Sequence, residues 1–116
     1  MAEDCLFCNI VAGDIPSTTV LDRDTVYAFR DIAPAAPVHV LIVPKKHVGD
    51  IRDLTAEHGE VLVDMLQAAN DVASSESIAE SGYRVIFNIG PDAGQTVFHL
   101  HMHVVGGKPL GGVGPG

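Results

Sequence analysis

The chain has 116 residues, close to the usual size of a single domain, which leaves little room for two. Its 7 lysines and arginines against 15 aspartates and glutamates give a net charge of −8, which argues against a nucleic-acid binder and, less strongly, against a ligand with several phosphates. Hydrophobic residues make up 47% and charged residues 19% of the chain, and these globular proportions argue against disorder over most of its length.

The first half of the chain predicts a short helix followed by three strands. Apolar residues recur at the spacing of one helix face over residues 6–12, and Ile15-Pro16 then favours an extended backbone. Three runs rich in β-branched and aromatic residues follow, the first two joined by a short polar turn. We therefore predict a hairpin and a third strand, over residues 18–21, 26–32 and 39–43.

The second half predicts one long helix and two further strands. Apolar residues recur every three or four positions over residues 56–75. Strands are predicted over residues 83–89 and 97–105, on either side of a turn-prone Gly-Pro loop. The Gly- and Pro-rich sequence from residue 106 has no periodicity, so no regular structure is expected there. This order of elements favours an α+β fold with a mostly antiparallel sheet and its helices on one side.

Three of the six histidines alternate along the last predicted strand, as His99, His101 and His103. Successive side chains of a strand point to opposite faces, so these imidazoles share one face while the apolar residues between them face the long helix. Imidazole is suited to proton transfer, nucleophilic attack and metal binding near neutral pH. A solvated strand face and a three-histidine zinc site are the alternatives.

Short hydrogen-bonding residues lie in the predicted loops beside this histidine face. Gln95 and Thr96 precede the last strand, and Asn88 lies near the end of the preceding one. Such groups can hold an oxyanion or a phosphate without a lysine or arginine. For each residue alone, turn formation is the simpler explanation.

The N-terminal sequence MAEDCLFCNI is acidic and has neither a basic segment nor a long apolar run, so it does not predict a secretory signal. No stretch approaches the roughly 20 apolar residues of a membrane helix. These features favour the cytoplasm, where Cys5 and Cys8 are expected to be thiols or metal ligands rather than a disulfide.

The pattern His-φ-His-φ-His-φ-φ, read here as HLHMHVV, resembles the signature of the histidine triad superfamily. The longer segments AFRDIAPAAPVHVLIVPKKHV and FNIGPDAGQTVFHLHMHVVGGKPL are similar to its branch of nucleoside phosphoramidases and related nucleotide-binding proteins. The resemblance implies the fold of that family over residues 1–110: an antiparallel sheet of about five strands, one short N-terminal helix and one long helix. Residues 111–116 are expected to form a flexible tail.

The resemblance implies a hydrolase that cleaves the P–N bond of purine nucleoside 5′-phosphoramidates and binds an AMP-type purine nucleotide. His101 matches the nucleophile that forms a nucleotidyl-histidine, and His103 matches a group that aids proton transfer to the leaving group. His99 completes the triad, and His39 supports it from the neighbouring strand. The alternative functions are a dinucleoside polyphosphate hydrolase and a nucleotide-binding regulatory module with little turnover.

Other positions match ligand-binding residues of that family. Asp31 matches the acidic residue that accepts hydrogen bonds from the ribose hydroxyls. Asn88, Gln95 and Thr96 match positions on the phosphate or leaving-group side. The apolar slot for the base, for which core packing is the alternative role, is matched by Leu6, Phe7, Ile10, Phe29, Ile32 and Leu41.

The resemblance also implies a structural zinc ion and a homodimer. Cys5, Cys8, His47 and His99 match a closed Cys₂His₂ site, in which His99 is structural and leaves the chemistry to the other two triad histidines. The long helix and an edge strand are expected to form the two-fold interface. Many members end in a Trp-Pro-Pro-Gly-like tail, whose aromatic residue this chain lacks. Neither a nucleic-acid nor a membrane partner is expected.

Overall fold

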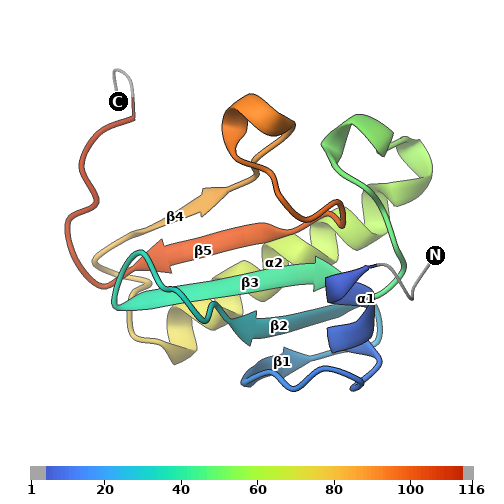
Figure 1. Cartoon of the computed structure of the whole chain (residues 1–116). Helices are drawn as coiled ribbons and strands as arrows, with labels where there is room; N and C mark the ends of the chain where they lie inside the picture. Colours follow the sequence, from blue (N-terminus) through green and yellow to red (C-terminus); the bar gives the residue numbers. More distant parts are fainter. Residues whose placement is uncertain (1–4, 114–116) are drawn as a thin grey trace.

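A five-stranded antiparallel sheet with the strand order β1-β2-β3-β5-β4 forms the centre of the protein (Figure 1). It is seen in a computed structural model, which describes residues 5–113. This confirms the predicted α+β class. The elements in chain order are α1 (Leu6–Val11), β1 (Thr19–Asp22), β2 (Val26–Arg30), β3 (Val38–Pro44), the 3₁₀ turns η2 (Ile51–Asp53) and η3 (Ala56–His58), α2 (Gly59–Ser75), β4 (Tyr83–Ile86), the 3₁₀ turn η4 (Pro91–Ala93) and β5 (Met102–Gly106).

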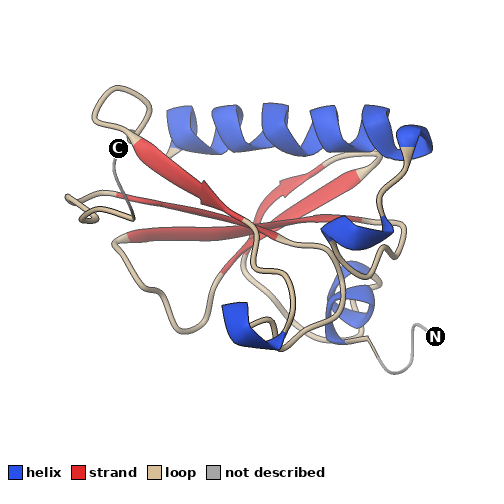
Figure 2. Cartoon of the chain, turned by 90° about the horizontal axis from the view of Figure 1, so that it is seen from above, coloured by secondary structure: helices blue, strands red, loops and turns tan. Residues whose placement is uncertain are grey.

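The two helices lie on opposite faces of the sheet, so the prediction that they share one side is wrong. Figure 2 shows α2 along one face and the short N-terminal helix on the other side. The reason is that β2 and β3 carry apolar side chains on both faces of the sheet, and each face is buried from solvent by one of the two helices. The α2 face buries Val26, Ala28, Val40, Ile42, Met65, Ala69, Val72, Met102 and Val104, and the α1 face buries Cys5, Phe7, Ile10, Tyr27, Phe29, Leu41 and Val43.

The long predicted helix begins one turn later than its periodicity indicates. Thr55 caps a 3₁₀ turn: its hydroxyl accepts from the backbone N–H of Glu57, and its own N–H donates to the ring of His58. Regular α-helix starts at Gly59 and buries Met65 and four further residues against the sheet. Within residues 5–113, no helix is long and apolar enough to cross a membrane.

The last two strands are shorter than predicted. β4 ends at Ile86, and β5 begins only at Met102, so His99 and His101 precede the strand. The segment before β5 bonds to the end of β3 and the loop after it, because Leu100 N–H donates to the Val48 carbonyl and the His99 ring donates to the Pro44 carbonyl. These contacts replace pairing with β4.

The C-terminal segment leaves the sheet after β5 without regular structure. Residues 107–113 form neither helix nor strand. Residues 114–116 of the predicted tail lie outside the described residues. The division into a domain of residues 1–110 and a tail of residues 111–116 stays a prediction.

Candidate functional site

The sheet face that α1 partly covers carries the histidines. In the antiparallel pairing of β3 with β5, Leu41 lies opposite His103 and His39 lies opposite Val105. Opposed residues project to the same face, so His39 and His103 lie side by side. A pocket of about 360 Å³ opens beside them, toward β4.

The protonation of His101 follows from the hydrogen bond that its ring makes with the backbone. Its Nδ1 lies 2.8 Å from the carbonyl oxygen of His99, and a carbonyl can only accept, so Nδ1 carries the proton. The Nε2 atom is therefore left with a free lone pair. The ring of Phe7 packs edge-on against the imidazole, with ring centroids 5.0 Å apart. His101 is thus held in one tautomer with a nucleophilic nitrogen.

A second chain of hydrogen bonds fixes the tautomer of His103. The backbone N–H of Ala35 donates to His39 Nδ1 at 3.0 Å, so the proton of a neutral His39 lies on Nε2. That nitrogen is 2.8 Å from His103 Nδ1 and 3.4 Å from the Asp31 carboxylate. His103 Nδ1 therefore accepts, and its proton lies on Nε2. The face presents an unprotonated nitrogen on His101 and an N–H on His103.

Burial, and then the neighbouring His101 and His39, lower the pKa of His103 to about 4, while Asp31 opposes the shift. The ordinary value is 6.5, so between these pH values the unfolded chain binds a proton that the folded protein does not. The contribution of His103 to the free energy of unfolding is therefore complete above pH 6.5 and is lost as the pH falls toward 4.

We expect the Tm of the protein to decrease over this pH range, and to decrease less in His103→Asn. Thermal unfolding followed by circular dichroism at several pH values measures both slopes, and the difference between them removes the effect of every other titrating group. Equal slopes would contradict a neutral, buried His103.

The residues predicted to bind the nucleoside separate into buried and exposed sets. Asp31 is half-buried, and its Oδ1 accepts from the backbone N–H of Ala33. Ile32 is fully exposed and Leu6 is 44% exposed, so neither has a core role. The other four are buried together under α1: Phe7, Ile10, Phe29 and Leu41.

The loop between β4 and β5 carries the predicted phosphate-side residues, and of these Asn88 lines the pocket together with His103. It turns through Gly90 and Gly94, whose φ angles of 84° and 85° favour glycine. Gln95 is buried, and its amide bonds to the backbone of Gly90 and Gly49, so this side chain holds the loop and is not free for a ligand. Thr96 is exposed, and Asn88 is half-buried in the pocket wall.

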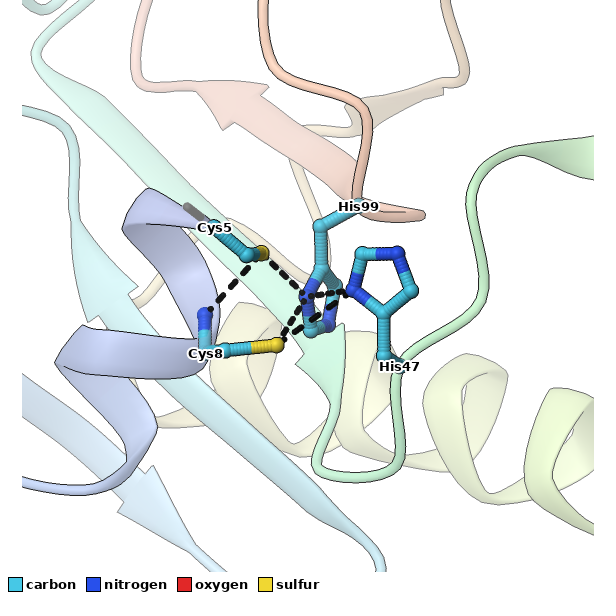
Figure 3. A group of neighbouring side chains, drawn as sticks. All are labelled: Cys5, Cys8, His47 and His99. Atoms are coloured by element: carbon cyan, nitrogen blue, oxygen red, sulfur yellow. Dashed lines mark hydrogen bonds between the residues drawn. The ribbon is translucent and has the colours of Figure 1, made fainter. Parts of the chain in front are cut away.

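Cys5, Cys8, His47 and His99 converge, although they come from three separate places in the sequence (Figure 3). Their donor atoms all lie within 4.8 Å of one another. The separations are 3.2 Å from Cys5 Sγ to His99 Nδ1, 3.3 Å from Cys8 Sγ to His47 Nδ1, and 3.2 Å between the Nδ1 atoms of the two histidines. A tetrahedral zinc with bonds of about 2.0–2.3 Å separates such donors by roughly 3.3–3.8 Å, so the four residues fit the ion.

Two further contacts prepare this cluster for a metal. His99 is fully buried, and its Nε2 donates to the Pro44 carbonyl at 2.8 Å, which leaves the Nδ1 lone pair for an ion. The backbone N–H of Cys8 donates to Cys5 Sγ at 3.3 Å. Burial, and then Cys5, raise the pKa of Cys8 to about 11, so holding this sulfur as a thiolate requires a nearby cation.

One side chain of the site was not predicted from the sequence. Arg84, on β4, lies opposite Val105, and its neighbour Ile86 lies opposite His103. Arg84 therefore projects toward the histidine face and lines the pocket with His103 and Asn88. The site residues predicted from the sequence include no lysine or arginine, so Arg84 adds a permanent positive charge to the pocket beside them. Arg84 and Asn88 are four residues apart in the predicted strand, and strand side chains alternate between faces, so the sequence already places Arg84 on the same face as Asn88.

The sequence matches, over residues 4–112, the family model described as Scavenger mRNA decapping enzyme C-term binding. It is 47% identical over 111 residues to the purine nucleoside phosphoramidase of Escherichia coli (strain K12), covering 96% of this chain and 93% of that protein. It is 41% identical over 109 residues to a 14 kDa zinc-binding protein of Brassica juncea, covering 92% and 96%. The fold matches a HIT family hydrolase from Clostridium thermocellum with a TM-score of 0.93 and 47% identity, covering 97% of this chain and 98% of that one.

Proposed function

Because the chain belongs to the histidine triad superfamily and is similar to its phosphoramidase-like branch, we propose that it hydrolyses purine nucleoside 5′-phosphoramidates at the P–N bond. The observation that carries this proposal is the pairing of two opposite tautomers, an unprotonated Nε2 on His101 beside an Nε2–H on His103. The name of the E. coli relative supports the same reaction class.

The reaction proceeds in two displacements at phosphorus. The Nε2 lone pair of His101 attacks the α-phosphorus, the new P–Nε2 bond forms, and the P–N bond to the amine breaks. The Nδ1–H bond to the His99 carbonyl stabilises the positive charge that develops on the imidazole. Water then attacks the same phosphorus, the P–Nε2 bond breaks, and the nucleoside monophosphate leaves.

Proton transfer in both steps is the role of His103. The negative charge of a bound phosphate raises the pKa of this imidazole, so His103 takes up a second proton, on Nδ1, with the substrate. The Nε2–H of His39 then turns from that nitrogen to the Asp31 carboxylate, which lies 3.4 Å away. It gives the Nε2 proton to the departing amine, which is a poor leaving group without it, and so becomes neutral. Neutral His103 then accepts the proton of the attacking water. Before the substrate binds, His39 positions the His103 ring through the 2.8 Å contact with its Nδ1, and the Asp31 carboxylate lies 3.4 Å from the same nitrogen of His39.

The nucleoside binds beside α1. The buried Phe7, Phe29 and neighbouring apolar residues form one wall of the base site, and the exposed Leu6 and Ile32 pack on the base when it binds. The Asp31 carboxylate accepts hydrogen bonds from the ribose hydroxyls. Asn88, Thr96 and loop backbone N–H groups hold the phosphate, with Gln95 fixing the loop.

A zinc ion held by Cys5, Cys8, His47 and His99 is part of the proposal, supported by the donor distances and by the zinc-binding relative. The ion supplies structural cross-linking and no step of the reaction. It ties α1 to the segment before β5 and keeps His99, and thereby the carbonyl that orients His101, in place. Reduced thiols are needed for this site, which supports a cytoplasmic location.

Exposed apolar residues on α2 and on the edge strand β4 support a homodimer, which we include in the proposal. Val63 and Leu66 on α2 are 52% and 45% exposed, and Val85 lies on β4, which is an edge strand of the described sheet. A two-fold axis beside β4 would pair the two edges into one continuous sheet and cover these side chains. Sedimentation equilibrium measures the expected mass of two chains.

The substrate class is tested by comparing kcat/KM for adenosine 5′-monophosphoramidate and for diadenosine tetraphosphate. We expect the phosphoramidate to be preferred by at least about tenfold, because the protein carries a net charge of −8 and a polyphosphate chain would be repelled. A preference for diadenosine tetraphosphate would overturn the proposed substrate class.

A further inference from the structure

The pocket over β4 lies on the leaving-group side of the proposed reaction. The base site lies under α1 against β2 and β3, and the strand order places β5, with His103, between β3 and β4. His103 delivers a proton to the leaving nitrogen, so that nitrogen lies next to His103 and away from the base. The pocket of about 360 Å³ continues outward from His103, and it is therefore where the rest of the leaving group lies.

The pocket wall combines aliphatic side chains with one cation. Ala36, Ile86, Val105 and Leu110 form much of the apolar lining. Arg84 is the only residue with a permanent positive charge among its described lining residues, and these include no aspartate or glutamate. The wall therefore suits a short organic group with a negative charge, even though the protein as a whole is acidic.

The guanidinium of Arg84 is held in place at the rim of this pocket. Its Nη2 donates to the backbone carbonyl of Gly111, so the segment after β5 anchors the side chain, and Leu110 closes the wall next to it. A guanidinium has five N–H donors, and one bond to a carbonyl leaves a pair that matches the two oxygens of a carboxylate. Because the Arg84 guanidinium is already held in one orientation, it binds a planar anion with little further loss of side-chain conformational freedom.

We infer that Arg84 determines the leaving-group specificity of the site: it binds a carboxylate on the departing amine, so that amines carrying a carboxylate are favoured over matched neutral amines. In such a substrate the amino nitrogen is bonded to the α-phosphorus next to His103, and the carboxylate binds Arg84. The P–N bond breaks, the nitrogen takes the His103 proton, and the free amino acid leaves while the nucleotide stays on His101. This inference rests on the proposed function and names its substrate class.

Two matched substrates test the inference: adenosine 5′-phosphoramidates of glycine and of glycinamide, which differ only in the charge of the terminal group. We expect the wild type to have a kcat/KM about tenfold higher for the glycine compound, mostly through a lower KM, which is the size expected for one charge-assisted hydrogen-bonded pair. In Arg84→Gln the ratio is expected to fall to near one, and Arg84→Lys should retain part of it.

The control is Arg23→Gln, the same substitution in an exposed arginine that pairs with Asp71 and lies outside the pocket. It also removes one positive charge from the protein, and it should leave the ratio unchanged. An unchanged ratio in Arg84→Gln, or an equal loss for both substrates, would overturn the inference and leave the proposed reaction standing. If the wild type hydrolysed neither compound, the proposed function would fail instead, and the Kd values of the two compounds for wild type and Arg84→Gln would still decide the role of Arg84.

Discussion

Replacing His101 with alanine is expected to lower kcat/KM for adenosine 5′-monophosphoramidate by about 10⁴-fold or more, as the loss of a covalent nucleophile does in other enzymes. The variant retains the His103 and His39 pair, Asp31 and the apolar wall under α1, so AMP should still bind with a Kd within a few-fold of the wild-type value. Steady-state kinetics and calorimetric titration with AMP measure the two effects separately.

The matched control for this experiment is His58→Ala, which removes a histidine that contacts Thr55 at the start of α2 and lies outside the site. We expect near-wild-type turnover from it. If His101→Ala retained more than about a tenth of wild-type activity, water would be attacking phosphorus directly, and the covalent mechanism would be wrong.

Replacing Cys8 with serine is expected to release the zinc, lower the Tm by about 10 °C and lower kcat/KM by at least about tenfold. Cys8 Sγ lies 3.3 Å from His47 Nδ1 and 3.4 Å from His99 Nδ1, so its loss opens the metal site between α1 and the segment before β5. Activity falls because the carbonyl that orients His101 belongs to His99. Metal analysis, thermal unfolding and kinetics measure the three effects.

A second variant separates loss of zinc from a packing defect. His47 is exposed, so His47→Gln removes a ligand without leaving a buried cavity, and it should also lose metal and Tm. Wild-type protein stripped by a chelator should behave in the same way and recover on addition of Zn²⁺. A metal-free wild type with an unchanged Tm would contradict the structural zinc site.

Much of the fold could be predicted because local pattern and local structure agree. The alternation of Leu100, Met102 and Val104 with the histidines predicts which side packs on α2, and these three residues are buried there. The helical period over residues 56–75 likewise predicts α2, and its buried Met65, Ala69 and Val72 follow that period.

The remaining features depend on contacts between distant segments. The prediction that residues 97–105 form one strand fails because the Pro44 and Val48 carbonyls bind residues 99 and 100 in place of a strand neighbour. The position of α1 depends on the second apolar face of β2 and β3, which a search for one buried face does not consider. The strand pairing that points Arg84 at His103 is likewise a tertiary property.

The central claim is that His101 attacks phosphorus and forms a covalent intermediate. The most direct measurement is the stereochemical course of hydrolysis of one diastereomer of adenosine 5′-phosphoramidothioate in ¹⁸O-enriched water, read from the configuration of the labelled thiophosphate product. Attack by His101 followed by attack of water inverts phosphorus twice, so the account predicts net retention. Net inversion would show a single direct displacement by water and would contradict it.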